Sequence, residues 1–141
     1  QDINRSVGDV MLGINDTAHW AIDLNNAANK KFVAEFEKAY KRLPSVYAAQ
    51  GYDTALIMDA AIRGAKGNIT DKDALRQQLQ NVKFDSVRGA FKFNTNHYPI
   101  QNYYLREVKK DAQGRLVNVL ASTQPIAANH GDAYVQECSM R

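Results

Sequence analysis

The sequence predicts an α/β protein, because segments with helical periodicity are followed by a long segment in which apolar residues alternate as in β-strands. Three segments, at about residues 29–43, 45–64 and 70–82, repeat apolar side chains at the spacing of a buried helix face. From residue 87 to residue 122 the apolar positions recur at every second residue instead. Turn-forming residues divide this last segment, which indicates a strand, a link and then a β-hairpin.

A short apolar run lies near the start of the chain. The run "DVMLGI", which ends at Ile14, is closed by an Asn-Asp pair, and its length and composition are typical of a buried strand. A loop is expected after it, with Thr17, His19 and Trp20, ending at "DLNNAAN". The first helix is then predicted from about Asn29 to Leu43, with Lys and Glu on one side and an apolar face opposite. That face consists of Phe32, Phe36, Ala39, Tyr40 and Leu43.

The second predicted helix begins in the sequence "PSVYAAQGYD". Pro44 suits an entry position, the Ser45 hydroxyl can accept a hydrogen bond from a free N–H, and Gly64 or Gly67 supplies the end. The stripe predicted to pack on the core consists of Tyr52, Ala55, Leu56 and Ile62.

The third predicted helix starts with Thr70 as its N-cap. Asp71 and Asp73 then fall in the first turn, where negative charge complements the helix dipole, so capping explains this carboxylate pair better than catalysis does. Its predicted buried stripe is Leu75, Leu79 and Val82. Among the later strand residues, Phe91 and Phe93 share one face, as do Tyr103 and Leu105, and turns are predicted at residues 94–97 and 111–114.

The composition bounds the class of protein. The 141 residues fit one domain or part of a larger protein, and 45% hydrophobic with 23% charged residues is ordinary for a soluble globular protein. The net charge of +3 is spread among interspersed charges, so nucleic-acid binding is not indicated. No apolar run approaches the ~20 residues that span a bilayer, and the first residues do not show the charged segment followed by an apolar one that is typical of a signal peptide. The first residue is not Met, which fits a processed terminus or a break inside a longer protein.

No motif in the sequence points to catalysis, a cofactor or a metal. The chain has no CxxC, HExxH, GxSxG, P-loop or GxGxxG pattern, and His19, His97 and His130 share no metal-ligand spacing. The lone Cys138 has no neighbouring base, and it could pair only with a cysteine outside this chain or remain a free thiol. We therefore predict a binding protein without cofactor or metal rather than an enzyme.

Aromatic residues supply the candidate ligand contacts. Trp20 follows the predicted strand, where ligands bind in open α/β sheets; its ring either stacks on a ligand or folds back on its own domain. His19 beside it is a loop histidine or a ligand contact. Tyr47 and Gln50 lie in the first turn of the second helix, where free N–H groups are presented, and Tyr47 either packs or faces a ligand.

The order of several motifs resembles a known family. "GYD.A", "AL", "D.VRG.F.F" and "YLREV" stand in the order and spacing of the C-terminal part of type I periplasmic solute-binding proteins, closest to the leucine/isoleucine/valine-binding or amide-binding branch. The similarity covers about Val10 to Leu120. It implies part of a two-lobed fold with parallel-sheet lobes, flanking helices and a terminal β-hairpin. It also implies an aromatic ligand contact at Tyr47, with Tyr52 anchoring the helix to its own lobe.

The resemblance also implies how the chain is divided. Residues 1–15 would end the second lobe and cross the hinge, residues 16–98 would belong to the first lobe, and residues 99–141 would return through a crossing to the hairpin of the second lobe and the tail. The expected partners are the remaining N-terminal part of the same protein, without which the chain would expose sheet edges and apolar faces, and the permease of an ABC transporter.

Two functions of this fold stay open. The first is capture of an amino acid or a small carboxylate, aromatic ones included, for transport across the membrane, with the protein periplasmic, or extracellular and tethered to the membrane. The second is ligand sensing in a regulator or receptor. A small α/β enzyme is a third class, and it would need a catalytic constellation that the sequence does not contain.

Overall fold

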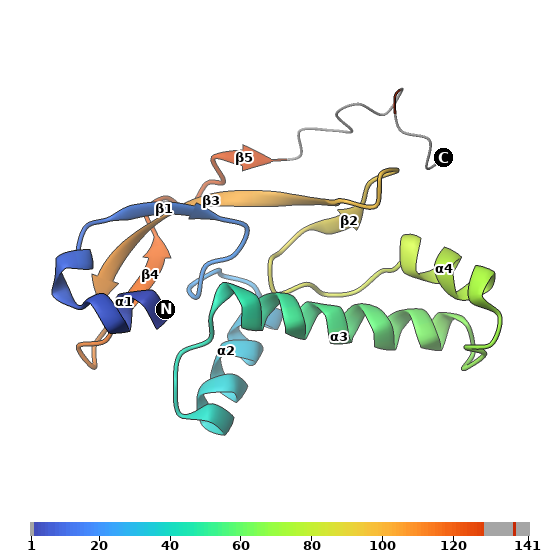
Figure 1. Ribbon diagram of the computed structural model, residues 1–141, viewed down its shortest axis with the longest axis horizontal. Helices are drawn as coiled ribbons and strands as arrows, with labels where there is room; N and C mark the ends of the chain where they lie inside the picture. The colour runs from blue at the N-terminus through green and yellow to red at the C-terminus, as the bar shows by residue number, and fades with distance from the viewer. Residues whose placement is uncertain (1, 129–136, 138–141) are drawn as a thin grey trace.

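The computed structural model describes residues 2–128 and 137, and Figure 1 shows the arrangement of their helices and strands. Cys138 and His130 lie outside the described residues. The elements are α1 (Asp2–Val7), η1 (Asp9–Met11), β1 (Asn15–Ala18), α2 (Ala27–Tyr40), α3 (Val46–Gly64), α4 (Lys72–Gln80), β2 (Phe91–Phe93), β3 (Pro99–Lys110), β4 (Leu116–Leu120) and β5 (Ala127–Ala128). Helices and strands are both present, as the sequence predicts for an α/β protein.

Strand β3 organises the sheet. It pairs with β1 and β4 on opposite edges of its second half, because Arg106 and Glu107 have a register partner in each of these strands. Its first half pairs with β2 and with β5. All of these pairings between described strands are antiparallel, so the parallel sheets implied by the resemblance are not formed by this part of the chain. The predicted turn at residues 94–97 makes β2 and β3 a hairpin in addition to the predicted hairpin of β3 and β4.

The buried side of β3 changes along the strand. In its first half Gln101 is buried, whereas in its second half the buried residues are Tyr104, Arg106 and Val108. Successive side chains of a strand point to opposite faces, so residues 104, 106 and 108 lie on one face and residue 101 lies on the other. The face of β3 that is covered by the rest of the chain therefore switches between Gln101 and Tyr104. Different elements therefore cover the two halves of β3.

The helix starts follow local hydrogen bonding. Ser45 caps α3 as predicted, because its hydroxyl accepts a hydrogen bond from the Ala48 N–H. The predicted cap of the third helix is wrong: Asp71, not Thr70, caps α4 by accepting from the Ala74 N–H, while Thr70 bonds to Asn68. The stripe predicted on α4 is only half-buried. In α2, the N-cap is Asn26 and the helix begins two residues earlier than predicted.

The prediction of a buried strand at Val10–Ile14 is also wrong. This run forms the single turn η1 and the bend after it, and Val10 is 74% exposed. Gly8 and Gly13 flank the turn with φ of 83° and 77°, values outside the extended range of a strand. The strand β1 instead takes the polar residues that follow, Asn15–Ala18.

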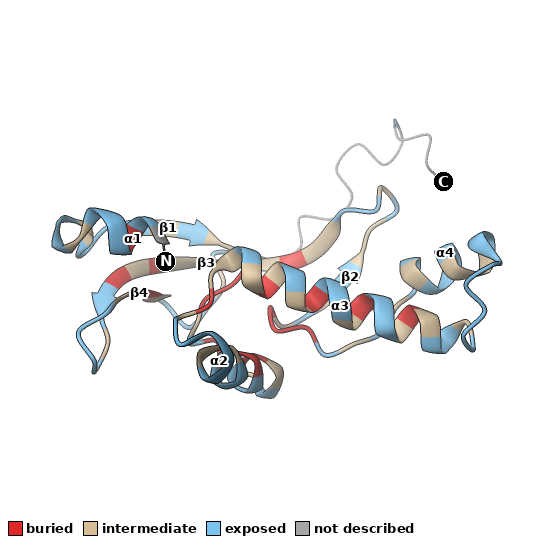
Figure 2. Cartoon of the chain, turned by 60° about the horizontal axis from the view of Figure 1, so that its bottom comes forward, coloured by how far each residue is buried: buried red, intermediate tan, exposed pale blue. Residues whose placement is uncertain are grey.

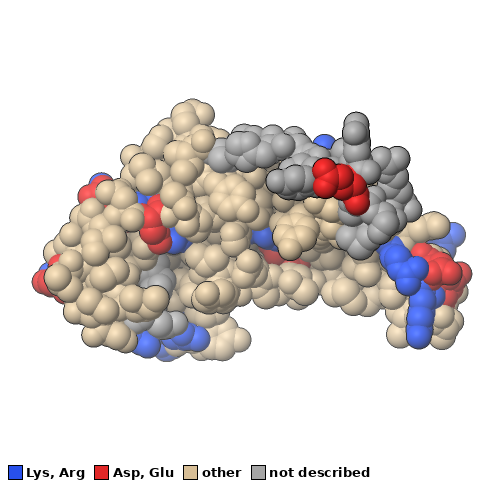
Figure 3. All heavy atoms as spheres, turned by 45° about the horizontal axis from the view of Figure 1, so that its top comes forward, with Lys and Arg blue, Asp and Glu red and all other residues tan. Residues whose placement is uncertain are grey.

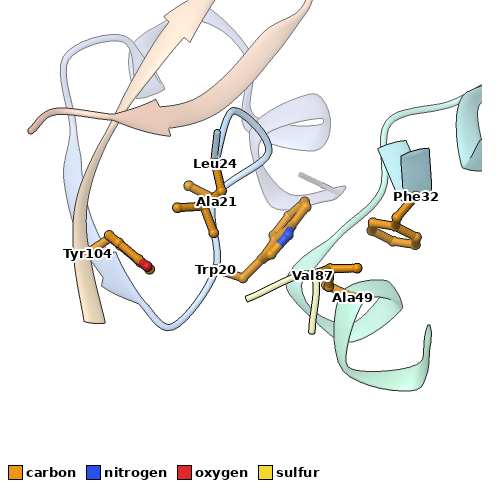
Figure 4. Close-up of a cluster of buried hydrophobic side chains, with 7 residues drawn as sticks. All are labelled: Trp20, Ala21, Leu24, Phe32, Ala49, Val87 and Tyr104. Carbon is orange, nitrogen blue, oxygen red and sulfur yellow. The ribbon is translucent and has the colours of Figure 1, made fainter. Parts of the chain in front are cut away.

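The hydrophobic core lies between β3 and helix α3. Figure 4 shows its buried members, which come from the loop after β1, from α2 and α3, from the loop before β2 and from β3: Trp20, Ala21, Leu24, Phe32, Ala49, Val87 and Tyr104. The red bands along α3 in Figure 2 mark its buried side. That side consists of Ala49, Asp53, Ile57 and Ala61, each one helical turn from the next. Ala55, which was predicted to lie on the core face, is exposed.

Candidate functional site

A hollow of about 510 Å³ lies beside the N-terminus of α3, and all four residues predicted as ligand contacts line it. Its walls come from α1, η1, β1, the loop after β1, the start of α3, β3 and β4. The polar and aromatic lining includes Asp16, His19, Trp20, Tyr47, Gln50, Tyr103 and Arg106. Segments far apart in the sequence thus bring hydrogen-bonding groups and aromatic rings to one place.

A larger hollow of about 860 Å³ lies between α2, α3 and the loop before β2. Lys31, Tyr52 and Phe91 are among its lining residues, and none of the predicted ligand contacts reaches it. A binding pocket is indicated by its volume together with convergent polar groups and groups of shifted pKa, and of these two hollows the one at the start of α3 contains His19, whose pKa is lowered. The hollow at the start of α3 is therefore the candidate site.

Tyr47 is the most exposed aromatic residue of this hollow. It is the second residue of α3, and its side chain is 82% exposed, so it does not belong to the core. Gln50 follows one turn later and is half-buried. Tyr103, which sequence reasoning did not select, approaches from β3 and is 41% exposed. Two tyrosine rings on different elements thus offer aromatic surface that the fold itself does not bury.

Trp20 is buried although it lies in a loop. Its side chain is 1% exposed, its ring lies edge-on to Phe32 with centroids 6.1 Å apart, and its Nε1–H donates to Oδ1 of Asn29 at 2.7 Å. Of the two interpretations of this residue, the geometry fits the one in which the ring folds back on its own domain. Trp20 borders the hollow as part of its wall, and its ring N–H already has a partner.

Asn29 holds the loop around Trp20 in place. Besides accepting from Trp20, its side-chain amide donates to the carbonyl oxygens of Ile22 at 3.0 Å and Leu24 at 3.1 Å. Asn29 is fully buried in the first turn of α2, so these bonds tie the loop to the helix. The sequence "DLNNAAN" gave no sign of this role, because asparagine there is equally typical of a loop.

Arg106 closes the hollow on the side of the sheet. Its guanidinium makes a two-point contact with the Asp16 carboxylate, at 2.9 and 2.5 Å, and donates to the Trp20 carbonyl at 3.0 Å. The Asn118 amide also donates to Asp16, at 3.3 Å. Arginine matches a carboxylate in this paired geometry, so the contact fixes β1 against β3. The sequence contains one sign of this role: Arg106 alternates with Tyr104 and Val108 on one face of the predicted strand, and a charged residue on a buried face needs a partner.

His19 is held neutral by its surroundings. Burial is the main cause that lowers its pKa below 6.5, and the positive charges of Arg88 and Arg106 lower it further, while Asp53 opposes them. Its ring lies edge-on to Tyr103 with centroids 6.3 Å apart. Among the described residues, its buried Nε2 atom has no hydrogen-bond partner. A neutral imidazole in this position offers one donor and one acceptor.

The lowered pKa predicts how stability depends on pH. Below a pH of about 6.5 the unfolded chain binds a proton at His19 more strongly than the folded chain does, so acid favours unfolding. The stability that depends on neutral His19 is expected to be complete above that pH, and it falls as the pH drops toward the pKa of His19 in the folded chain. Urea midpoints measured between about pH 8 and pH 5 should therefore fall less in His19→Gln than in the wild type.

His97→Gln is the matched control for this measurement, because His97 lies on the exposed turn between β2 and β3. This variant also removes one histidine, but at a residue outside the hollow, so it shows how far the loss of a histidine elsewhere changes the urea midpoints. If the urea midpoint falls with pH equally steeply in the wild type and in His19→Gln, protonation of His19 is not coupled to folding.

Charged side chains do not form one continuous patch over the part of the surface that is described in Figure 3. On the face shown in Figure 3, Lys, Arg, Asp and Glu gather mainly toward the two ends of the molecule, with mostly uncharged side chains between them outside the grey region. No group of three or more His, Cys, Asp or Glu able to hold a metal ion occurs in residues 2–128. In the same part of the chain, no helix has the length and apolar character needed to cross a membrane.

Comparison with known proteins places the fold. The family model described as periplasmic binding protein matches residues 1–113. The Leu/Ile/Val-binding protein homolog 6 of Brucella abortus is 31% identical over 119 residues, which are 80% of this chain and 30% of the relative. The chain thus spans about a third of the length of the curated relatives it matches.

Solved structures of solute-binding proteins are also similar to this chain. A solute-binding protein of an R. palustris ABC transporter, in complex with benzoate, is 36% identical with a TM-score of 0.77 and covers 92% of this chain, which spans 35% of that protein. A second, from Rhodopseudomonas palustris BisB5 with 3,4-dihydroxybenzoic acid, is 28% identical with a TM-score of 0.78, again over 92% of this chain and 35% of the other. A leucine-binding protein from Thermotoga maritima shares the fold at 22% identity and a TM-score of 0.67 over 83% of this chain and 33% of its own. The fold is therefore part of the two-lobed architecture of these proteins, and the chain belongs to the periplasmic binding protein family.

Proposed function

We propose that this chain is part of the solute-binding component of an ABC transporter, which captures an amino acid or a small carboxylate between two lobes in the periplasm. The observation that carries the proposal is the hollow at the start of α3, where His19, Tyr47 and Gln50 converge in a chain of this family. The family and the similar structures are those of transporter binding proteins, which supports solute binding rather than catalysis.

An aromatic carboxylate is the first ligand class to test. The Tyr47 side chain is 82% exposed and that of Tyr103, whose ring also contacts His19, is 41% exposed; a planar ligand stacks on or packs edge-on to such rings. The Nε2 atom of His19 has no hydrogen-bond partner among the described residues, and a neutral imidazole can donate or accept one bond, so His19 can bond to a polar group of the ligand. The similar proteins at 36% and 28% identity carry benzoate and 3,4-dihydroxybenzoic acid.

We propose a division into lobes that changes near the start of β3. Its covered face switches between Gln101 and Tyr104, close to residue 99, where the return crossing is expected. We place residues 16–98 in one lobe, and residues 1–15 and 99–141 in the crossings and the second lobe. Ile3, Val7 and Val10 are exposed apolar side chains of α1 and η1, and the remaining part of the same protein would cover them. The permease is the partner of the complete protein.

Tyr47→Ala is expected to weaken ligand binding by at least about tenfold, roughly 1.4 kcal/mol. The ring is exposed in the ligand-free structure, so its removal leaves no cavity in the core and the melting temperature should stay near the wild-type value. Isothermal titration of the complete two-lobed protein with benzoate, 4-hydroxybenzoate and leucine measures the affinity, and calorimetry without ligand measures the melting temperature.

Tyr52→Ala is the matched control from the same helix. Tyr52 is half-buried, and its ring lies 4.8 Å from that of Phe32, so its loss should lower the melting temperature. The assignment of the hollow fails if Tyr47→Ala keeps full affinity for a ligand that the wild type binds. The proposed function fails if the wild type binds no member of a panel of amino acids and aromatic carboxylates.

A further inference from the structure

A buried polar network joins helix α3 to strand β3 through the loop before β2. The Asp53 carboxylate accepts hydrogen bonds from the Ser86 hydroxyl at 2.6 Å, the Val87 N–H at 2.9 Å and the Arg88 Nε–H at 2.7 Å. The other end of the Arg88 guanidinium donates from Nη1 to Oε1 of Gln101 at 2.7 Å. One arginine side chain thus spans from α3 to β3.

Each polar member of this network is withdrawn from solvent. Asp53 is 0% and Arg88 7% exposed, and Ser86 and Gln101 are also buried. The Arg88 guanidinium lies 4.6 Å from the centre of the Phe91 ring, which covers it. Asp53 is the one charged residue on the buried side of α3, where its neighbours are Ala49, Ile57 and Ala61.

Stability alone does not account for such a network. Taking two charges out of water costs about as much as their attraction returns, and apolar residues of similar volume are often neutral or better in such places. What the ion pair adds is direction, because the guanidinium is planar and its donors point in fixed directions. Packed apolar side chains would hold α3 near β3 without fixing its position as narrowly.

The network sits next to the candidate ligand contacts. Asp53 follows Gln50 by three residues and Tyr47 by six, so Tyr47 lies about 9 Å away along the helix axis. A tilt of about 10° at Asp53 would displace the Tyr47 end of the helix by about 1.6 Å, which is more than a binding site tolerates. At the other end of the span, Gln101 precedes Tyr103 by two residues on β3.

We propose that Arg88 is a positioning residue for ligand binding, which fixes the first turns of α3 with Tyr47 and Gln50 relative to the strand that carries Tyr103. This role rests on the proposed function of the hollow. Arg88 does not line the hollow and acts only through the elements that it joins. Its guanidinium has to reach Asp53 and Gln101 at once, a span that the single ammonium group of lysine cannot make.

Amide hydrogen exchange of the ligand-free complete protein tests the positioning directly. In Gln101→Leu, which removes only the contact with β3, and in Arg88→Lys, peptides covering residues 46–52 should exchange at least about tenfold faster than in the wild type. Residues 57–64 of the same helix should change much less. Ile57→Val is the matched control, because it loosens the buried side of α3 without touching the network, and it should leave residues 46–52 near wild type.

Titration with benzoate then measures the consequence for binding. Gln101→Leu and Arg88→Lys should weaken affinity by about fivefold or more at a temperature at which both remain folded, whereas Ile57→Val should bind as the wild type does. Unchanged exchange at residues 46–52 in both network variants would overturn the proposal, and so would unchanged affinity. Absence of ligand binding by the wild type would refute the proposed function, and the exchange experiment would still decide whether Arg88 positions α3.

Discussion

Asp53→Ala is expected to lower the free energy of unfolding by about 3–5 kcal/mol, because it leaves the Arg88 guanidinium buried without its counter-charge. The Ser86 hydroxyl and the Val87 N–H lose their acceptor in the same step. Urea denaturation followed by the fluorescence of Trp20, the single tryptophan, measures the loss.

Asp59→Ala is the matched control on the same helix. Asp59 also pairs with an arginine, Arg63, at 2.9 Å, but both side chains are more than half exposed, and surface pairs of this kind contribute about 0–1 kcal/mol. A second variant, Asp53→Leu with Arg88→Met, removes both charges and should recover the part of the loss that is due to the unpaired guanidinium, while the Ser86 hydroxyl and the Val87 N–H stay without their acceptor. If Asp53→Ala costs no more than Asp59→Ala, the buried pair does not stabilise α3.

Trp20→Ala is expected to cost about 3–5 kcal/mol of stability, the usual range for deleting a large aromatic side chain from a core. The replacement leaves a cavity beside Phe32, and the Oδ1 atom of Asn29 loses the hydrogen bond that it accepts from the Trp20 ring N–H. Circular dichroism during urea denaturation measures this loss without relying on tryptophan fluorescence.

Trp20→Phe separates the contributions of ring and N–H. It keeps most of the aromatic contact with Phe32 but loses the donor to Asn29, so a smaller loss of about 1–3 kcal/mol is expected. A Trp20→Ala protein with wild-type stability and abolished ligand binding would contradict the core assignment and restore the stacking role considered from the sequence.

The features predicted correctly from the sequence depend on neighbouring residues. Ser45 caps the N–H three residues ahead, and the turn at residues 111–114 is held by Asp111, which accepts from the Gln113 N–H. Such interactions are encoded within one turn of the chain, so a single sequence contains the whole signal. The family pattern supplied the rest of the fold prediction.

The features that were missed depend on residues far apart in the chain. Asp53 and Arg88 are separated by 35 positions, and Asp16 and Arg106 by 90. A charged residue is expected at the surface unless its partner is known, so neither pair could be found from residue pattern alone. The opposite error concerns Val10, where an apolar run suggests burial although the side chain is 74% exposed.

The same limit applies to the candidate site. His19, Trp20, Tyr47 and Gln50 were selected separately, from loop position, residue type and family pattern, and their convergence on one hollow is a tertiary property. Tyr103 was read only as a strand residue. Residue pattern leaves both interpretations of Trp20 open, because its anchor, Asn29, belongs to the next helix.

The switch of covered face along β3 has a consequence for insertions and deletions. Removing one residue between Gln101 and Tyr104 would turn every side chain of one half to the opposite face, so either Gln101 would leave Arg88 or Arg106 would leave Asp16. The two halves of the strand therefore hold each other in register, and neither can slide by one position while the other keeps its contacts. Length variation among close relatives should accumulate in the turns at either end of β3, and the strand itself should keep its number of residues.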